Sequence, residues 1–119
     1  MRKPSSPKPW NDTVLPIACP SMDFAIIHWY PNSGTDPAQA LGTPSQIASM
    51  LSSVRAKLNQ YCGSRASSMQ IFITEMNGGS YNPGSRATGW ASAMFLDDTY
   101  MTFLENGWPM SIGGRFMMT

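Results

Sequence analysis

The chain has 119 residues, of which 42% are hydrophobic and 13% are charged, and its formal net charge is +1. This composition is typical of a folded segment with much buried surface rather than of a disordered one. The only basic cluster is formed by Arg2, Lys3 and Lys8. Nucleic acid is therefore a poor candidate partner, because phosphate binding needs a concentrated basic face. No apolar run approaches the roughly 18 residues of a membrane span, so we expect no membrane partner.

Residues 1–22 are interpreted as an extended, proline-rich lead-in. The stretch starts basic but lacks the apolar run of a signal peptide, so we expect no export signal within the chain itself. Asn11 or Asp12 is a candidate cap for one short helical turn. Pro16 is expected to limit the length of that turn, because proline cannot donate a backbone hydrogen bond.

The chain has two cysteines, Cys19 and Cys62. They are too few for a disulfide scaffold, and one disulfide and two free thiols are both open. A zinc site built from cysteine and histidine is not expected, since there is a single histidine and no ligand-like spacing. We expect neither a metal nor a cofactor.

Residues 23–30 (DFAIIHWY) predict a buried strand, because they are short, rich in β-branched and aromatic residues, and bounded by Pro20 and Pro31. Their almost continuous apolar character suits a parallel strand covered on both faces. The residues that follow, up to Gly42, are expected to form a loop.

A helix is predicted over residues 43–62. Thr43, Pro44 and Gln46 match a capping box with proline at the first helical position. Gly63 is a stop signal. Apolar residues then recur at helical spacing and are expected to pack in the core. They are Ile47, Met50, Leu51, Val54, Leu58 and Tyr61.

A second strand over residues 69–75 and a second helix over residues 90–106 complete the predicted elements. A loop rich in glycine, asparagine, serine and proline separates them, and Asn106-Gly107 ends the helix. The residues of this helix expected toward the core are Ala91, Phe95, Leu96, Tyr100, Phe103 and Leu104. The order strand, helix, strand, helix predicts an α/β fold with a parallel sheet and right-handed crossovers.

Polar residues continue one face of each predicted strand. Since residues two apart point to the same side, His28 and Tyr30 share one face of the first strand, and Ile71, Ile73 and Glu75 share one face of the second. Ligands gather at the carboxyl ends of strands in α/β folds. A histidine or tyrosine there is more often structural, but a carboxylate ending an apolar strand is costly without partners or water. We expect His28, Tyr30 and Glu75 to meet at one rim.

Two of these segments together resemble a known family. Asp-Phe-Ala-Ile-Ile-His-Trp-Tyr-Pro, followed by Ile-Phe-Ile-Thr-Glu-Met-Asn, resembles strands six and seven of retaining (β/α)8-barrel glycoside hydrolases. This clan includes α-L-arabinofuranosidases and endoglycanases. The resemblance implies a partial TIM barrel of about two β-α units over residues 23–107, since a complete barrel takes about 250 residues.

The resemblance also implies roles for individual residues. Glu75 matches the clan's catalytic nucleophile, and His28 and Tyr30 match a pair that lines the sugar site. Trp29, Asn77 and Trp90 are further candidates for binding the sugar. The expected partners are a carbohydrate and the missing barrel strands of a parent enzyme. A secreted parent would be compatible with a disulfide between the two cysteines.

The match fails in two places. The clan's acid/base glutamate comes from the fourth strand, which nothing before residue 23 can supply, so the isolated chain is expected to be inactive. Residues 108–119 make a poor eighth strand and are interpreted as an irregular tail. One shifted reading frame permits Val-Ala-Asn-Val-Asp-Trp-Trp there, so a frameshift is one explanation. A non-catalytic carbohydrate-binding protein and a self-contained small α/β domain are the alternatives.

Overall fold

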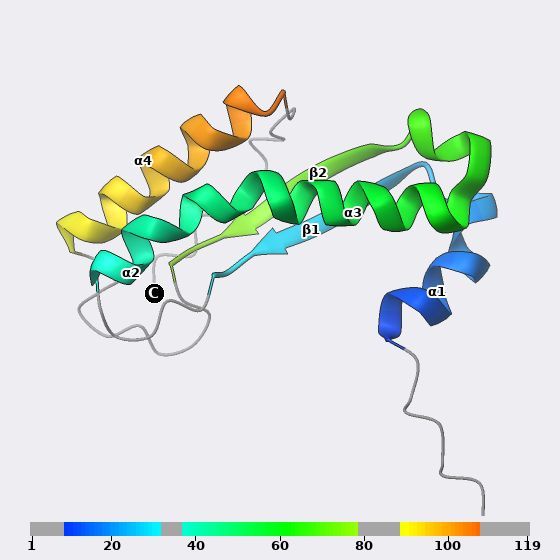
Figure 1. The fold of residues 1–119 in the computed structure, drawn as a ribbon, viewed down its shortest axis with the longest axis horizontal. Coiled ribbons are helices and arrows are strands. Elements are labelled where there is room, and N and C mark those ends of the chain that lie inside the picture. The colour runs from blue at the N-terminus through cyan, green and yellow to red at the C-terminus, as the bar shows by residue number, and fades with distance from the viewer. Residues whose placement is uncertain (1–8, 32–36, 79–88, 108–119) are drawn as a thin grey trace, which may run out of the picture.

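The computed structural model describes residues 9–31, 37–78 and 89–107, and the predicted tail 108–119 and residues 1–8 of the lead-in lie outside these ranges. The described residues form four α-helices and two strands (Figure 1). In chain order they are α1 (Trp10–Ala18), β1 (Phe24–Trp29), α2 (Pro37–Gly42), α3 (Ile47–Cys62), β2 (Gln70–Met76) and α4 (Trp90–Glu105), with 3₁₀ segments at Cys19–Ser21, Thr43–Gln46 and Gly63–Ser67.

The two strands form a parallel sheet, with Phe24 opposite Gln70 and Ala25 opposite Ile71. Because α3 lies between them in sequence, β1, α3 and β2 make one β-α-β unit. Figure 1 shows α3 running across both strands with α4 beside it. The predicted mixed α/β class and the parallel pairing are confirmed.

One face of the sheet is covered by helices. Ile71 and Ile73 of β2 are buried there, as is Trp29 of β1. Two apolar clusters fill this layer. One joins the strands to α3 and α4, and it contains Trp29, Ile47, Leu51, Ile73, Phe95 and Phe103. The other lies toward the strand starts, and it contains Leu58, Ala66, Met69 and Ile71.

The opposite face of the sheet is open. Phe24 is 50% exposed and Ile26 is 51% exposed, although both are large apolar side chains. The Phe24 ring meets the Phe72 ring edge to face, with their centroids 5.5 Å apart. The open face therefore carries an apolar strip that no described helix covers.

A bulge in β2 changes the side to which Glu75 points. The register is regular until Ile27 pairs with Ile73, and then His28 pairs with Glu75, so Thr74 is the extra residue. The prediction that Glu75 shares a face with Ile71 and Ile73 is wrong, because those two face the helices. The bulge places Glu75 on the open side with His28.

The start of the first long helix also differs from the prediction. Thr43 does not cap a helix, since its hydroxyl donates to the Ala40 carbonyl at 2.7 Å. Residues predicted as loop form α2, and Thr43–Gln46 is a 3₁₀ segment that leads into α3. At the other end, Gly63 ends α3 with φ +56, as the stop signal predicted.

The lead-in is more helical than predicted. α1 runs from Trp10 to Ala18 and includes Pro16, which was expected to end it. Contacts with α3 hold this helix at both ends, because Lys57 Nζ lies 2.5 Å from Asp12 Oδ1 and a disulfide joins Cys19 to Cys62. These tertiary contacts offset the backbone hydrogen bond that proline removes.

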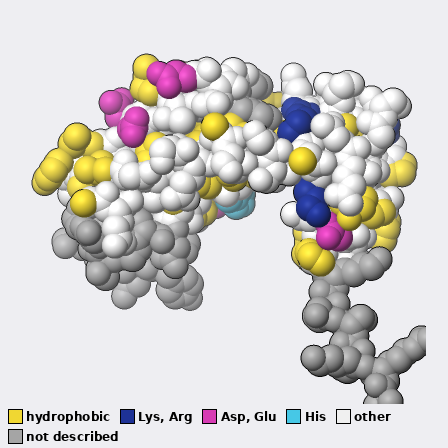
Figure 2. All heavy atoms as spheres, viewed as in Figure 1, with side chains coloured by type: hydrophobic (Ala, Val, Ile, Leu, Met, Phe, Trp, Pro, Cys, Tyr) yellow, Lys and Arg dark blue, Asp and Glu magenta, His cyan; other side chains and the backbone are white. Residues whose placement is uncertain are grey.

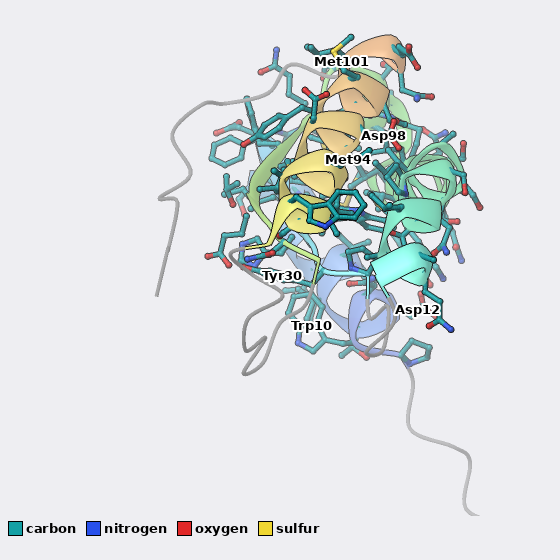
Figure 3. The ribbon with its side chains drawn as sticks, turned by 90° about the vertical axis from the view of Figure 1, so that its left-hand side faces the viewer. Trp10, Asp12, Tyr30, Met94, Asp98 and Met101 are labelled. Carbon is teal, nitrogen blue, oxygen red and sulfur yellow. A yellow bond between two sulfur atoms is a disulfide. The ribbon has the colours of Figure 1, made fainter. Side chains whose placement is uncertain are left out.

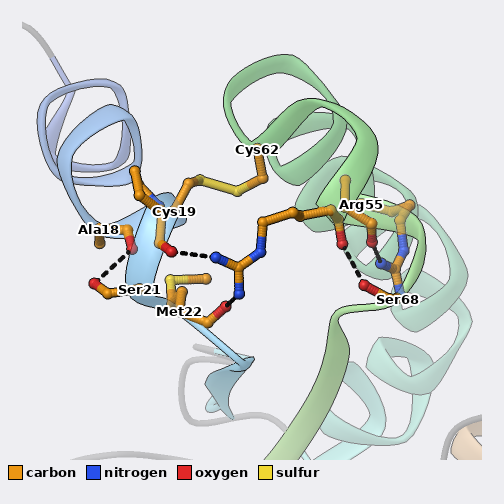
Figure 4. Close-up of a disulfide and its surroundings, with 10 residues drawn as sticks. Ala18, Cys19, Ser21, Met22, Arg55, Cys62 and Ser68 are labelled. Atoms are coloured by element: carbon orange, nitrogen blue, oxygen red, sulfur yellow. Dashed lines mark hydrogen bonds between the residues drawn. A yellow bond between two sulfur atoms is a disulfide. The ribbon is translucent and has the colours of Figure 1, made fainter.

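The disulfide lies at the end of the sheet where both strands begin (Figure 4). Its two Cα atoms are 5.1 Å apart, within the ordinary range for a cystine bridge. Beside it, the Arg65 guanidinium donates to the carbonyls of Pro20 and Met22. This end of the molecule is therefore joined by covalent, ionic and hydrogen-bonded contacts between distant parts of the chain.

Candidate functional site at the carboxyl end of the strands

Three polar side chains meet where the strands end, and we call His28, Tyr30 and Glu75 the rim cluster. The Tyr30 hydroxyl donates to Glu75 Oε2 at 3.0 Å. His28 Nδ1 lies 3.4 Å from the same oxygen. The His28 and Tyr30 rings pack edge to face with their centroids 6.5 Å apart. The predicted contact between the first strand and Glu75 is present.

Strand geometry explains this meeting. His28 occupies the last open-side position of β1, and Tyr30 follows two residues later on the same side. The bulge turns Glu75 toward them instead of toward the helices. Figure 3 views the molecule from this end and labels Tyr30 there. The positions of all three residues are therefore set by the end of the sheet and not by a long loop.

Both contacts to the carboxylate use Oε2, so neither occupies Oε1. The side chains of His28 and Glu75 are each 48% exposed, which leaves the group open to a ligand. Figure 2 shows the molecular surface hollowed beside α1, below the helices. An exposed carboxylate with one oxygen fixed by a phenol can accept hydrogen bonds or act as a nucleophile with the other.

The pKa of Tyr30 is raised above its ordinary value, first by burial, then by the hydrogen bond to Glu75 and by the charge of that carboxylate. All three causes favour the neutral phenol, which can donate a hydrogen bond. The pair is therefore arranged as a neutral phenol that donates to a carboxylate oxygen.

Trp29 does not join the rim cluster. Its side chain is 8% exposed and packs in the apolar cluster with Ile47 and Phe95 on the helix side of the sheet. The interpretation of Trp29 as a sugar-binding residue is therefore corrected, because a ligand on the open side cannot reach its ring. The reason is the alternation of the strand, which turns Trp29 away from His28 and Tyr30.

Asn77 and Trp90 lie near the same end without contacting the cluster in any described interaction. The Asn77 backbone N–H donates to the Trp29 carbonyl at 3.1 Å and extends the pairing of the strands. Its side-chain oxygen accepts from the Gly78 N–H at 2.7 Å. Trp90 begins α4 with its indole exposed. Whether either residue binds a sugar stays a prediction.

Within residues 9–31, 37–78 and 89–107, no group of three or more histidine, cysteine or acidic residues could hold a metal ion. In the same residues, no helix is long and apolar enough to cross a membrane.

Sequence reasoning did not predict the bulge at Thr74. The only signal in the sequence was the glutamate itself, since a carboxylate on the helix side of this sheet would be buried among Ile71, Ile73 and Phe95 without a partner. The free-energy cost of burying that carboxylate could by itself have indicated that the strand changes the side it presents before residue 75.

Comparison of the chain with protein-family models, with curated proteins and with solved structures found no match.

Proposed function

We propose that this chain is the part of a retaining (β/α)8 glycoside hydrolase that carries the nucleophile, Glu75, on its seventh strand. The observation that carries the proposal is the rim cluster, in which Tyr30 donates to Glu75 Oε2 and leaves Oε1 for reaction. In a retaining mechanism, such a carboxylate attacks the anomeric carbon and forms a glycosyl-enzyme that water then hydrolyses.

Each residue of the cluster has a role in this proposal. Oε1 of Glu75 bonds to the anomeric carbon as the glycosidic bond breaks. Tyr30 holds Oε2 in place, since its neutral hydroxyl donates a hydrogen bond to that oxygen. His28 of β1 lies 3.4 Å from Oε2 and orients the carboxylate, which belongs to β2.

The open face of the sheet supports the barrel part of the proposal. Phe24 and Ile26 are half exposed on that face, and each strand has one neighbour only among the described residues. Closing the sheet into a barrel would bury both side chains and pair both free edges. The strands that do so would belong to the parent enzyme, as would the acid/base carboxyl about 5 Å from Glu75.

The test is covalent labelling with 2,4-dinitrophenyl 2-deoxy-2-fluoro-glycosides of arabinofuranose, xylose and glucose. Their leaving group needs no general acid, so the missing acid/base does not prevent the first step. We expect one sugar to add to the peptide containing Glu75, with release of dinitrophenolate, and no addition in Glu75→Gln. Equal addition to that variant would refute the role of Glu75 as nucleophile. The absence of any addition to a chain whose Tyr30–Glu75 contact is intact would refute it as well.

Hydrolysis of ordinary aryl glycosides distinguishes a chain that carries only the nucleophile from a complete enzyme. Without a general acid, which contributes about 10²- to 10⁴-fold, the chain should show no meaningful hydrolysis of them. Turnover of nitrophenyl glycosides that survives Glu75→Gln would contradict the role given to Glu75.

A non-catalytic carbohydrate-binding protein is the second candidate. It is favoured by the presence of a single carboxylate in the rim cluster among the described residues. It predicts saturable binding of free sugars, equal in the wild type and in Glu75→Gln, with no covalent addition.

A further inference from the structure

α4 carries large apolar side chains on two opposite sides. On the side toward the sheet, Phe95, Thr99 and Phe103 are completely buried. On the other side, four large apolar residues are between 51% and 72% exposed. They are Trp90, Met94, Met101 and Leu104, and Figure 3 labels Met94 and Met101 on the outside of the helix. The prediction that Leu104 faces the core is therefore wrong.

The four exposed residues form one stripe. At 100° per residue, they fall within an arc of about 80°, centred opposite Thr99. Single exposed apolar residues are normal on protein surfaces, but a continuous stripe along a whole helix marks a contact surface. A helix that is apolar on two opposite sides fits between two layers of protein. The sheet is one layer, and residues 9–31, 37–78 and 89–107 supply no second layer on the exposed side.

Acidic residues accompany this stripe. α4 contains three acidic residues, Asp97, Asp98 and Glu105, and no lysine or arginine. By the same helical spacing Asp97 lies inside the stripe, and Asp98 and Glu105 lie along one border. Figure 2 shows acidic and hydrophobic side chains together over α4.

We propose that the outer side of α4 docks an amphipathic helix whose apolar stripe carries a lysine or arginine at its centre, opposite Asp97. The partner's apolar side chains cover the four exposed residues of α4. Its cation pairs with Asp97, which would otherwise be buried as an unpaired charge. This surface faces away from the sheet, so the inference does not depend on the role of Glu75.

The position of Asp97 argues against a second copy of this chain as the occupant. Asp97 and Asp98 lie at the middle of the helix Trp90–Glu105. Two copies of α4 paired about a twofold axis through that point would place these carboxylates opposite one another inside an apolar contact. Like charges in an interface cost several kcal/mol. A partner with a central cation meets the same carboxylates favourably.

Two matched peptides test the proposal. Each is an 18-residue fluorescein-labelled helix with one leucine stripe, and they differ only at the central stripe position, which is lysine in one and glutamate in the other. Fluorescence anisotropy measures their dissociation constants for the chain. We expect the lysine peptide to bind about tenfold or more tightly than the glutamate peptide, because mispairing of a buried charge is costly.

Variants of exposed residues show whether α4 is the site. Asp97→Lys should reverse the preference between the two peptides, and Met101→Ser should weaken both. Ile17→Ser is the matched control, because Ile17 is an exposed apolar residue of α1, and both affinities should stay unchanged. Failure of the lysine peptide to bind overturns the proposal. Equal affinities that Asp97→Lys does not alter, or a dimer of the chain dispersed by Met101→Ser, also overturn it.

Discussion

The two ends of the parallel sheet differ in what holds them together. Where the strands begin, a disulfide and the side chain of Arg65 join segments of the chain that lie far apart in sequence. Where the strands end, the rim cluster contains three side chains that contact one another, and His28 and Glu75 are half exposed. We therefore expect the first end to contribute more to stability than the second, a division that is common in α/β barrels.

The disulfide should have the largest effect on stability. It joins residues 43 apart, and the entropy of closing such a loop corresponds to about 4 kcal/mol. Replacing both Cys19 and Cys62 by serine should therefore lower the free energy of unfolding by about that amount, measured by urea denaturation. The oxidised wild type is compared with the reduced wild type as a control. A loss as small as that of a surface substitution would show that the end of the sheet where the strands begin is not the stabilising one.

Arg55 should have the next largest effect. Its Nη1 donates to the carbonyls of Ala66 at 2.7 Å and Met69 at 3.0 Å, which fixes the turn before β2. Arg55→Met keeps the apolar stem and removes these bonds, so we expect a loss of about 1.5–3 kcal/mol in urea.

Lys57→Met is the matched control for Arg55→Met, because it removes a cation from the same helix. Lys57 pairs with Asp12 at the surface, where solvent weakens such pairs. Lys57→Met should therefore lower the free energy of unfolding by less than Arg55→Met does. The reverse order would mean that the contact with α1 stabilises this end of the sheet more than the turn before β2 does.

Glu75→Gln should have almost no effect on stability. The side chain is half exposed, and glutamine keeps its shape and one hydrogen-bond acceptor. We expect a change within about 0.5 kcal/mol in the same urea assay. A loss as large as that of Arg55→Met would make the rim cluster structural and remove the contrast between the two ends.

The pH dependence of stability should differ by a small amount between the wild type and Tyr30→Phe. The pKa of Tyr30 is raised in the folded chain by burial and by Glu75. Its contribution to stability is thus fully present below the pKa of an unfolded tyrosine, about 10, and is lost as the pH rises through the folded-state pKa. Thermal melts from pH 8 to pH 11 should show this loss in the wild type and less of it in Tyr30→Phe.

Local signals made the strands and the long helices predictable. The apolar runs of β1 and β2, the glycine at position 63 and the Asn106-Gly107 pair each act within a few residues, and each predicted boundary lies within a few residues of the observed one. The predicted meeting of His28, Tyr30 and Glu75 followed from the parallel order of the strands.

Of the three features that were missed, two depend on contacts between residues distant in sequence, and the one at Thr43 is local. Pro16 stays inside α1 because α3 holds both ends of that helix. Thr43 matches a helix cap in sequence but bonds to Ala40 instead. The bulge at Thr74 reverses the side of Glu75, and only its partners on β1 account for that reversal. Alternation along a single strand cannot predict such a change.

The pKa of Tyr30 tests most directly whether the rim cluster acts as one unit. It can be measured by ¹³C NMR titration of the chain with ring-labelled tyrosine, and Tyr30→Phe assigns the signal. We predict a pKa above 10 in the wild type and a lower one in Glu75→Gln, since the charge and part of the hydrogen bond are lost while burial remains. A Tyr30 pKa that is identical in both proteins would contradict the coupling of Tyr30 to Glu75, and with it the site proposed for this chain.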